Sequence, residues 1–141
     1  MQSFDYRSFE TAGIDWGFQQ TQKVPMQTTT LEQHWHTYIL AFNTSAEEVR
    51  APLLEQCVSA GVVFTNPGAE GKGRANLSAH IGQFHASKPG MFFTTDKVLA
   101  QPDKLLAVWS MHRPDGVAVA TGYNFVQPDA DGRLHYMAGF F

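Results

Sequence analysis

Six histidines are the side chains of this chain best suited to acid–base chemistry, because imidazole titrates near neutral pH. His34 and His36 lie two residues apart and His80 and His85 lie five apart, in stretches that the sequence predicts to be helical. Neither spacing puts both rings on one helix face, so we expect no metal site. His80 and His112 remain as candidate general bases.

Each of these two histidines borders a face that should be buried. His80 lies between Leu77 and Phe84 on a predicted helix, and His112 ends a predicted strand in which it alternates with Ser110. Either ring could serve as a base if it faced a cavity. The alternative is a histidine in the core or at its rim that is hydrogen-bonded to the backbone.

Aromatic side chains form the second group of candidates. Leu31, Trp35, Tyr38 and Phe42 fall on one stripe of a predicted helix, so Tyr38 either presents its hydroxyl to a ligand or only packs its ring. We expect Trp35 and Trp109 to contact a ligand, although Trp109 also fits the role of a large anchor on a sheet face.

A polar amide among small residues marks the strand predicted over residues 117–127. Alternation places Asn124 on the same face as Ala118, Ala120 and Gly122. Small side chains leave room either for a ligand or for a covering helix, and the pattern fits both.

The elements that would position these residues follow an α+β order, with helices before a run of strands. Predicted helices cover about residues 31–42 and 75–86, and Thr30 with Gln33 caps the first of them. A helical segment between them begins at Ser45, breaks near Arg50 to Pro52 and ends before Gly61. Predicted strands cover residues 62–66, 91–99, 105–112, 117–127 and 133–141, and residues 68–73 form a flexible loop. Asp131-Gly132 predicts a tight hairpin turn.

Composition limits the class of protein. A length of 141 residues with 43% hydrophobic content suits one domain. The basic residues are scattered and the net charge is -3, so we expect no basic surface that would bind nucleic acid. The single cysteine, Cys57, indicates a buried thiol in a reducing compartment. No apolar run reaches membrane-spanning length and no secretory signal is present, so we expect a cytoplasmic protein that does not bind membranes.

The first 28 residues form a predicted extension to the domain at 29–141. They carry Phe4, Tyr6, Phe9, Trp16 and Phe18 in no helical or strand period. So many aromatic residues predict a segment that packs on its own domain or on a partner subunit.

Several short motifs together resemble the SnoaL-like branch of the nuclear transport factor two superfamily. In chain order they are Tyr38 on the first helix, Phe64-Thr-Asn-Pro67 on a strand, Gly73-Arg-Ala-Asn-Leu77 opening a helix, and Gly122-Tyr-Asn-Phe125 before Asp131-Gly-Arg-Leu134. The resemblance implies an α+β fold in which a strongly curved, mixed or antiparallel sheet forms a cone-shaped barrel around a cavity with about three N-terminal helices. It also implies a homodimer formed through the sheet.

Ketosteroid isomerases of this superfamily use an Asp base and an oxyanion hole made by a Tyr and a protonated Asp. The resemblance places Tyr38 at the oxyanion tyrosine, Asn66 at the base and Asn124 at the second oxyanion acid. An amide cannot accept a proton at neutral pH, so the hydrogen-bond donors are retained while the base is missing. His80 or His112 would have to replace it.

These observations predict a protein that binds a small, mostly apolar carbonyl or hydroxyl compound. As an enzyme it would act without a cofactor, by acid–base chemistry of the isomerase, cyclase or dehydratase type. The alternatives are a non-catalytic binding or interaction module, and a dimer whose cavity is filled by its own side chains.

Overall fold

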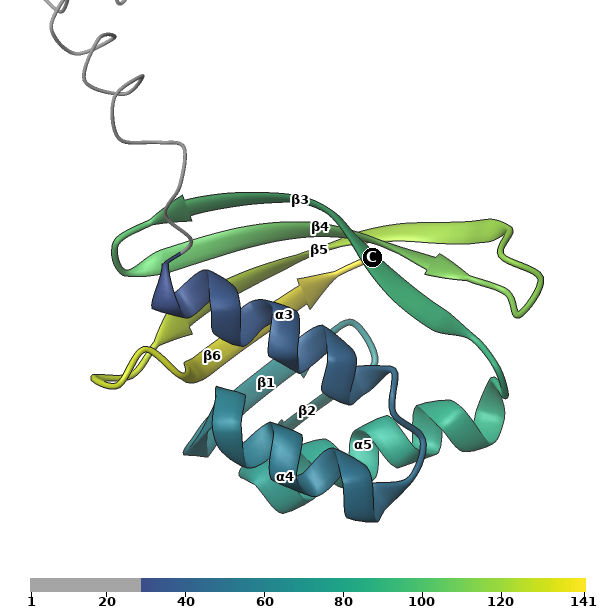
Figure 1. The fold of residues 1–141 in the computed structure, drawn as a ribbon, viewed down its shortest axis with the longest axis horizontal. Coiled ribbons are helices and arrows are strands. Elements are labelled where there is room, and N and C mark those ends of the chain that lie inside the picture. Colours follow the sequence, from purple (N-terminus) through teal and green to yellow (C-terminus); the bar gives the residue numbers. More distant parts are fainter. Residues whose placement is uncertain (1–28) are drawn as a thin grey trace, which may run out of the picture.

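A computed structural model describes residues 29–141, in which three helices pack on one side of a six-stranded mixed sheet (Figure 1). The elements in chain order are α3 (Thr30–Phe42), α4 (Glu47–Cys57), β1 (Val58–Asn66), β2 (Ala69–Lys72), α5 (Arg74–Ser87), β3 (Phe92–Gln101), β4 (Lys104–His112), β5 (Ala118–Pro128) and β6 (Leu134–Phe140). This architecture confirms the predicted α+β class. The aromatic residues of the predicted extension lie outside the described part.

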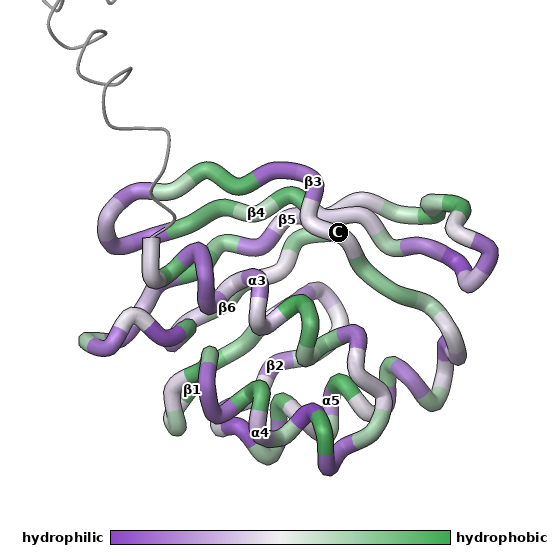
Figure 2. Tube along the Cα trace, in the orientation of Figure 1, coloured by the Kyte–Doolittle hydropathy of each residue, from purple (hydrophilic) through white to green (hydrophobic). Residues whose placement is uncertain are grey.

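The sheet has the order β2-β1-β6-β5-β4-β3, and only β1 and β6 pair in parallel. It bends over the helices without closing into a barrel, since β2 and β3 remain its two edges (Figure 1). Hydrophobic stretches of the neighbouring strands β3 and β4 lie side by side (Figure 2). Because side chains alternate between the two faces of a strand, one face of this sheet turns toward the helices and the other turns away.

Helix α3 begins one residue earlier than the sequence suggested. Its cap is Thr29, whose hydroxyl accepts the backbone N–H of Glu32 at 3.0 Å, and not Thr30 with Gln33. The predicted stripe is confirmed, because Leu31, Trp35 and Tyr38 are buried.

Helix α4 corrects two predictions. It runs unbroken through Pro52, and it passes directly into β1 at Val58, so Gly61 lies inside a strand and does not end a helical region. Pro52 is exposed, which lets water satisfy the carbonyl that its missing N–H leaves free.

Residues 68–73 are also more ordered than predicted, because most of them form β2 in a hairpin with β1. Gly71 permits this pairing: a Cβ at that position would lie 2.5 Å from the Phe64 ring, so only glycine lets the ring rest on the strand. The four long strands of the C-terminal half agree with prediction apart from their ends. Gly132, with φ 79°, makes the predicted turn between β5 and β6.

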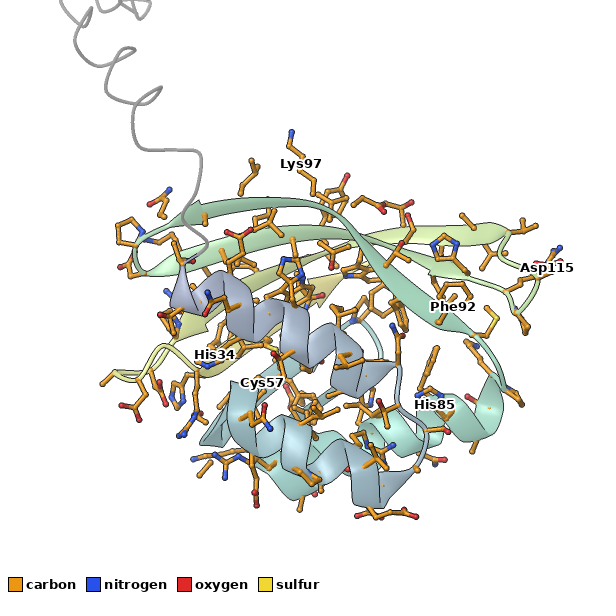
Figure 3. All side chains as sticks on the ribbon, viewed as in Figure 1. His34, Cys57, His85, Phe92, Lys97 and Asp115 are labelled. Carbon is orange, nitrogen blue, oxygen red and sulfur yellow. The ribbon has the colours of Figure 1, made fainter. Side chains whose placement is uncertain are left out.

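The core lies between the helices and the concave face of the sheet, and Cys57 is buried there (Figure 3). Lys97 points away from the helices on the opposite face (Figure 3). Within residues 29–141, no helix is both long enough and apolar enough to cross a membrane.

A buried arginine joins the helical layer. Arg50 of α4 donates from Nε to Ser78 Oγ of α5 at 2.9 Å, and from one terminal nitrogen to the carbonyls of Thr44 and Ser45 at 2.9 and 3.0 Å. All of these acceptors are neutral oxygens, so the guanidinium acts here as a fork of donors.

Replacing Arg50 with Ala should therefore lower the free energy of unfolding by about 3 kcal/mol, since it leaves buried oxygens without donors and opens a void. Chemical denaturation measures this change. Arg133→Ala, at an exposed surface pair with Asp131, is the matched control and should change stability by less than about 0.5 kcal/mol. Equal effects of the two substitutions would contradict the structural role of Arg50.

Candidate active site between the helices and the sheet

A cavity of about 490 Å³ lies between α3, α5 and the concave face of the sheet. Its walls are mostly aromatic and apolar, with Trp35 and Phe42 from α3, Phe64 from β1, Phe93 from β3 and Trp109 from β4. The volume is within the range of small-molecule sites, roughly 300–1,000 Å³. Side chains of the described residues therefore do not fill this space.

Six of the seven predicted site residues line this cavity, namely Trp35, Tyr38, Asn66, His80, Trp109 and Asn124. They come from α3, β1, α5, β4 and β5, so the fold joins residues that are far apart in sequence. The small residues on the Asn124 face of β5 help to keep the space open, since Ala120 also lines it.

The amide of Asn124 has a fixed orientation. Its Oδ1 accepts the indole N–H of Trp109 at 3.0 Å, and because an indole nitrogen can only donate, this contact identifies the oxygen. The Asn124 NH₂ group makes no hydrogen bond to another residue within 29–141, so both of its hydrogens are available to a ligand. Asn124 thus contributes donors to the cavity.

Glycine at position 122 makes this contact possible. Gly122 pairs with Trp109 across β4 and β5, and a Cβ at position 122 would overlap the indole ring. The indole therefore lies against the sheet, where its N–H reaches Asn124. A larger residue at 122 would push the ring into the cavity and break the hydrogen bond.

Asn66 is oriented in the same sense. Its Oδ1 accepts the backbone N–H of Gly68 at 2.9 Å in a turn after β1, and its Nδ2 lies 3.4 Å from Nε2 of His80. Since the amide oxygen is already used, Nδ2 is the donor to His80. This contact favours the tautomer in which His80 Nε2 carries the lone pair.

The two amides flank Gly139, on the strand between them. A Cβ at Gly139 would lie 3.3 Å from Asn124 Oδ1 and 3.5 Å from Asn66 Cβ. Glycine leaves the floor between β1 and β5 without a side chain, so a ligand can approach both NH₂ groups.

His80 is half-buried among aromatic rings. Its ring centroid lies 5.5 Å from that of Phe64 and 6.5 Å from that of Phe42. Burial disfavours the charged imidazolium and lowers the pKa of His80 below its usual 6.5. His80 is therefore neutral at pH 7 and can accept a proton.

Tyr38 contributes a third donor. Burial, with a smaller effect of the nearby Cys57, raises the pKa of Tyr38, so its phenol stays protonated. Its ring packs on Trp35 and Phe42, and its hydroxyl has no hydrogen-bond partner within residues 29–141. Burial also raises the pKa of the Cys57 thiol to about 12, which makes it a poor nucleophile.

His112 is the predicted site residue that the structure does not bring to the cavity. It lies on the opposite face of the sheet, stacked on Phe92 at 4.9 Å. Its Nε2 lies 2.8 Å from Thr94 Oγ1 and its Nδ1 lies 3.2 Å from the Gly116 carbonyl. Strand alternation already linked His112 to Ser110, but the sequence could not say which face was concave.

Three other histidines have structural contacts. His34 bonds the Gly132 carbonyl at 2.7 Å, His85 bonds the Phe42 carbonyl at 2.7 Å and His135 bonds Ser59 at 2.7 Å. Within residues 29–141, no three His, Cys, Asp or Glu side chains are grouped so that they could hold a metal ion.

Several cavity residues were not singled out from the sequence. Gln83 and Ser87 of α5 and its C-cap residue Lys88 line the space together with His80, as do Phe93 and Met111 of the sheet. Helical periodicity counted from His80 would have found the residues of α5, because positions three, seven and eight further along return toward the same side.

The fold and this cavity define the class of protein: a small α+β domain with an aromatic pocket between a helical layer and a curved sheet. Residues 37–137 match the family model of the SnoaL-like domain, and the chain belongs to this family. No curated protein matches the sequence.

Solved structures agree with this assignment. A candidate isomerase of the SnoaL-like family from Agrobacterium tumefaciens is 25% identical with a TM-score of 0.75, covering 80% of this chain and 97% of its own. An NTF2-like protein of unknown function from Exiguobacterium is 18% identical with a TM-score of 0.62, over 75% of this chain and 95% of its own. A candidate ketosteroid isomerase from Kribbella flavida is 19% identical with a TM-score of 0.58, over 79% of this chain and 76% of its own. The last two similarities are evidence for the fold alone.

The environment of His80 gives a pH-dependent prediction. Its NMR titration should have a midpoint below 6.5, because burial lowers the pKa of its ring. Between pH 7 and the folded-state pKa the unfolded chain binds more protons at this site, so stability should fall as pH decreases through this interval. In His80→Gln this part of the pH dependence should disappear. A midpoint at or above 6.5 would contradict the buried, neutral imidazole.

Proposed function

We propose that this protein binds a small, mostly apolar carbonyl or hydroxyl compound in the cavity and acts on it by cofactor-free acid–base chemistry of the isomerase, cyclase or dehydratase type. One observation carries the proposal: Asn66 and Asn124 have their amide oxygens occupied and present NH₂ donors in the same cavity as a neutral histidine. Donors of this kind suit a substrate oxygen on which negative charge develops.

For a ketone substrate, the carbonyl oxygen would accept hydrogen bonds from Asn124 Nδ2, from the Tyr38 hydroxyl and from the second Nδ2 hydrogen of Asn66, the one that does not face His80. His80 Nε2 would take a proton from the carbon beside the carbonyl, and the electron pair of that C–H bond would form a C=C bond as the oxygen becomes an enolate. If the ketone also carries a C=C bond beyond that carbon, the enolate extends over it as a dienolate. Return of the proton from Nε2 to the far carbon of that bond would then give an isomer with the double bond shifted and restore the neutral ring. The 3.4 Å contact from Asn66 is long for a hydrogen bond, so it orients the lone pair without blocking it.

The competing function is binding without catalysis. It is favoured by Asn66 and Asn124, which the resemblance places where ketosteroid isomerases carry acidic residues. Amides recognise oxygen atoms without moving protons. The two functions differ in one measurable property, which is proton transfer at a carbon next to the carbonyl.

Replacing His80 with Gln should reduce that transfer. The wild-type protein in D₂O should accelerate exchange of the protons next to the carbonyl of 2-acetylnaphthalene or 4-phenylcyclohexanone, followed by ¹H NMR. His80→Gln should lower the enzymatic rate by about 10²-fold or more, and Tyr38→Phe should also lower it, since each removes a group that acts in the transition state.

His36→Gln is the matched control, because His36 is exposed on α3 and does not line the cavity. Its exchange rate should equal that of the wild type. Binding of these ketones without accelerated exchange would support the binding module. Exchange that survives in His80→Gln would remove His80 from the mechanism.

We further propose that two copies pair through the convex face of the sheet. The described helices all lie on the other side (Figure 1). The strand register puts the exposed side chains of Leu99, Tyr123 and Phe140 on the convex face together with Lys97. Asp96 and Lys97 lie on the same face, so a two-fold axis near them would set the acid of one copy against the lysine of the other.

Tyr123→Glu should weaken this dimer by at least about tenfold, because it buries a charge at the interface centre. Sedimentation equilibrium of the full chain measures the association. Leu40→Glu, at an apolar residue of α3 that is at least as exposed as Tyr123, should leave the association unchanged. A monomeric wild-type protein, or equal effects of the two substitutions, would contradict pairing through this face.

A further inference from the structure

Lys88 gives the cavity a charge that neither the proposed proton transfer nor the amide donors require. Lys88 is the C-cap residue that follows the last turn of α5, and its exposed side chain lines the cavity. Its ammonium makes no ion pair with a carboxylate within residues 29–141, whereas Lys104 pairs with Asp103 at 2.7 Å. Lys88 is thus a free cation at the edge of an apolar space.

The rest of the lining carries no opposing charge. No Asp or Glu of the described chain lines the cavity, and His80 is neutral at pH 7 because burial lowers its pKa. The two amides whose orientation is fixed, Asn66 and Asn124, present donors. The potential in the cavity is therefore positive toward its Lys88 end, and an anion is the charge that it would attract.

The geometry of α5 indicates the length of a ligand that would contact both His80 and Lys88. Lys88, at the C-cap of α5, follows His80 by eight residues, which corresponds to about 12 Å along the helix axis at 1.5 Å per residue. Phe84 lies between them and packs on Phe93 with ring centroids 5.1 Å apart, so the intervening wall is aromatic.

We infer that the substrate is an apolar oxo acid, a ketone that also carries a carboxylate. The ketone oxygen lies at Asn124 and Asn66 beside His80, the flat apolar body rests on Phe84 and Phe93, and the carboxylate meets Lys88 at the mouth. This inference deepens the proposed function and rests on it. A lysine at the C-cap of a helix also complements the helix dipole, but that role does not require it to line the cavity.

The test compares two ligands that differ in the carboxylate alone. Calorimetric titration of the full chain with 6-acetyl-2-naphthoate and 2-acetylnaphthalene should give about fivefold tighter binding of the acid, a size expected for a partly exposed charge pair. In Lys88→Met the two ligands should bind equally, and the wild-type preference should shrink in 0.5 M NaCl because salt screens the pair. Lys72→Met, at an exposed lysine of β2 that does not line the cavity, should keep the preference.

Equal binding of the two ligands to the wild-type protein would overturn the oxo acid and leave the proposed ketone site intact. A preference that persists in Lys88→Met would overturn the role of Lys88. Failure of both ligands to bind would contradict the proposed function as well, so the two failures can be told apart.

Discussion

The hydrogen bond from Trp109 to Asn124 is the interaction on which the site depends. It occupies the amide oxygen, so that the amide can offer only donors to the cavity. It also holds the indole against the sheet, which keeps the cavity open. Both effects require glycine at position 122, because any side chain there would occupy the place of the ring.

The amide of Asn66 is oriented by the same kind of contact at the other end of the cavity floor. The turn after β1 uses the oxygen of Asn66, and the remaining NH₂ group faces His80. Burial among aromatic rings then keeps His80 neutral and Tyr38 protonated. A few local contacts thus produce a low-dielectric cavity that has donors and a neutral base, with no carboxylate among the described lining residues. Such a cavity suits a substrate whose oxygen becomes negative during reaction.

Much of the fold could be predicted from sequence because its signals are local. The stripe from Leu31 to Phe42, the turn at Asp131-Gly132 and the alternation around Asn124 depend on periods of 3.6 and 2, which the sequence shows directly. The path from α4 to β1 was mispredicted because Pro52 and Gly61 usually interrupt regular structure. Here Pro52 is tolerated because it is exposed, and Gly61 lies in β1, whose pairing with neighbouring strands outweighs the local preference of glycine.

The site was predictable only in part, for a different reason. Asn66 was found only through a family resemblance, which also gave Tyr38 and Asn124 their roles. His80 and His112 looked equivalent until the concave face of the sheet was known. The orientation of the amides depends on contacts between strands and turns, such as Trp109 with Asn124, which no periodicity in the sequence encodes. Lys88 was missed because a lysine at a helix end has an ordinary explanation in the helix dipole.

The most direct measurement of the central claim is a ¹H–¹⁵N NMR titration of the side-chain amides with 2-acetylnaphthalene. If Asn66 and Asn124 present NH₂ donors to a ligand oxygen, their NH₂ signals should move downfield and saturate together, while exposed Asn76 stays unchanged. If the ketone binds and these two signals do not move, the amides do not hold the ligand oxygen and the proposed site is wrong.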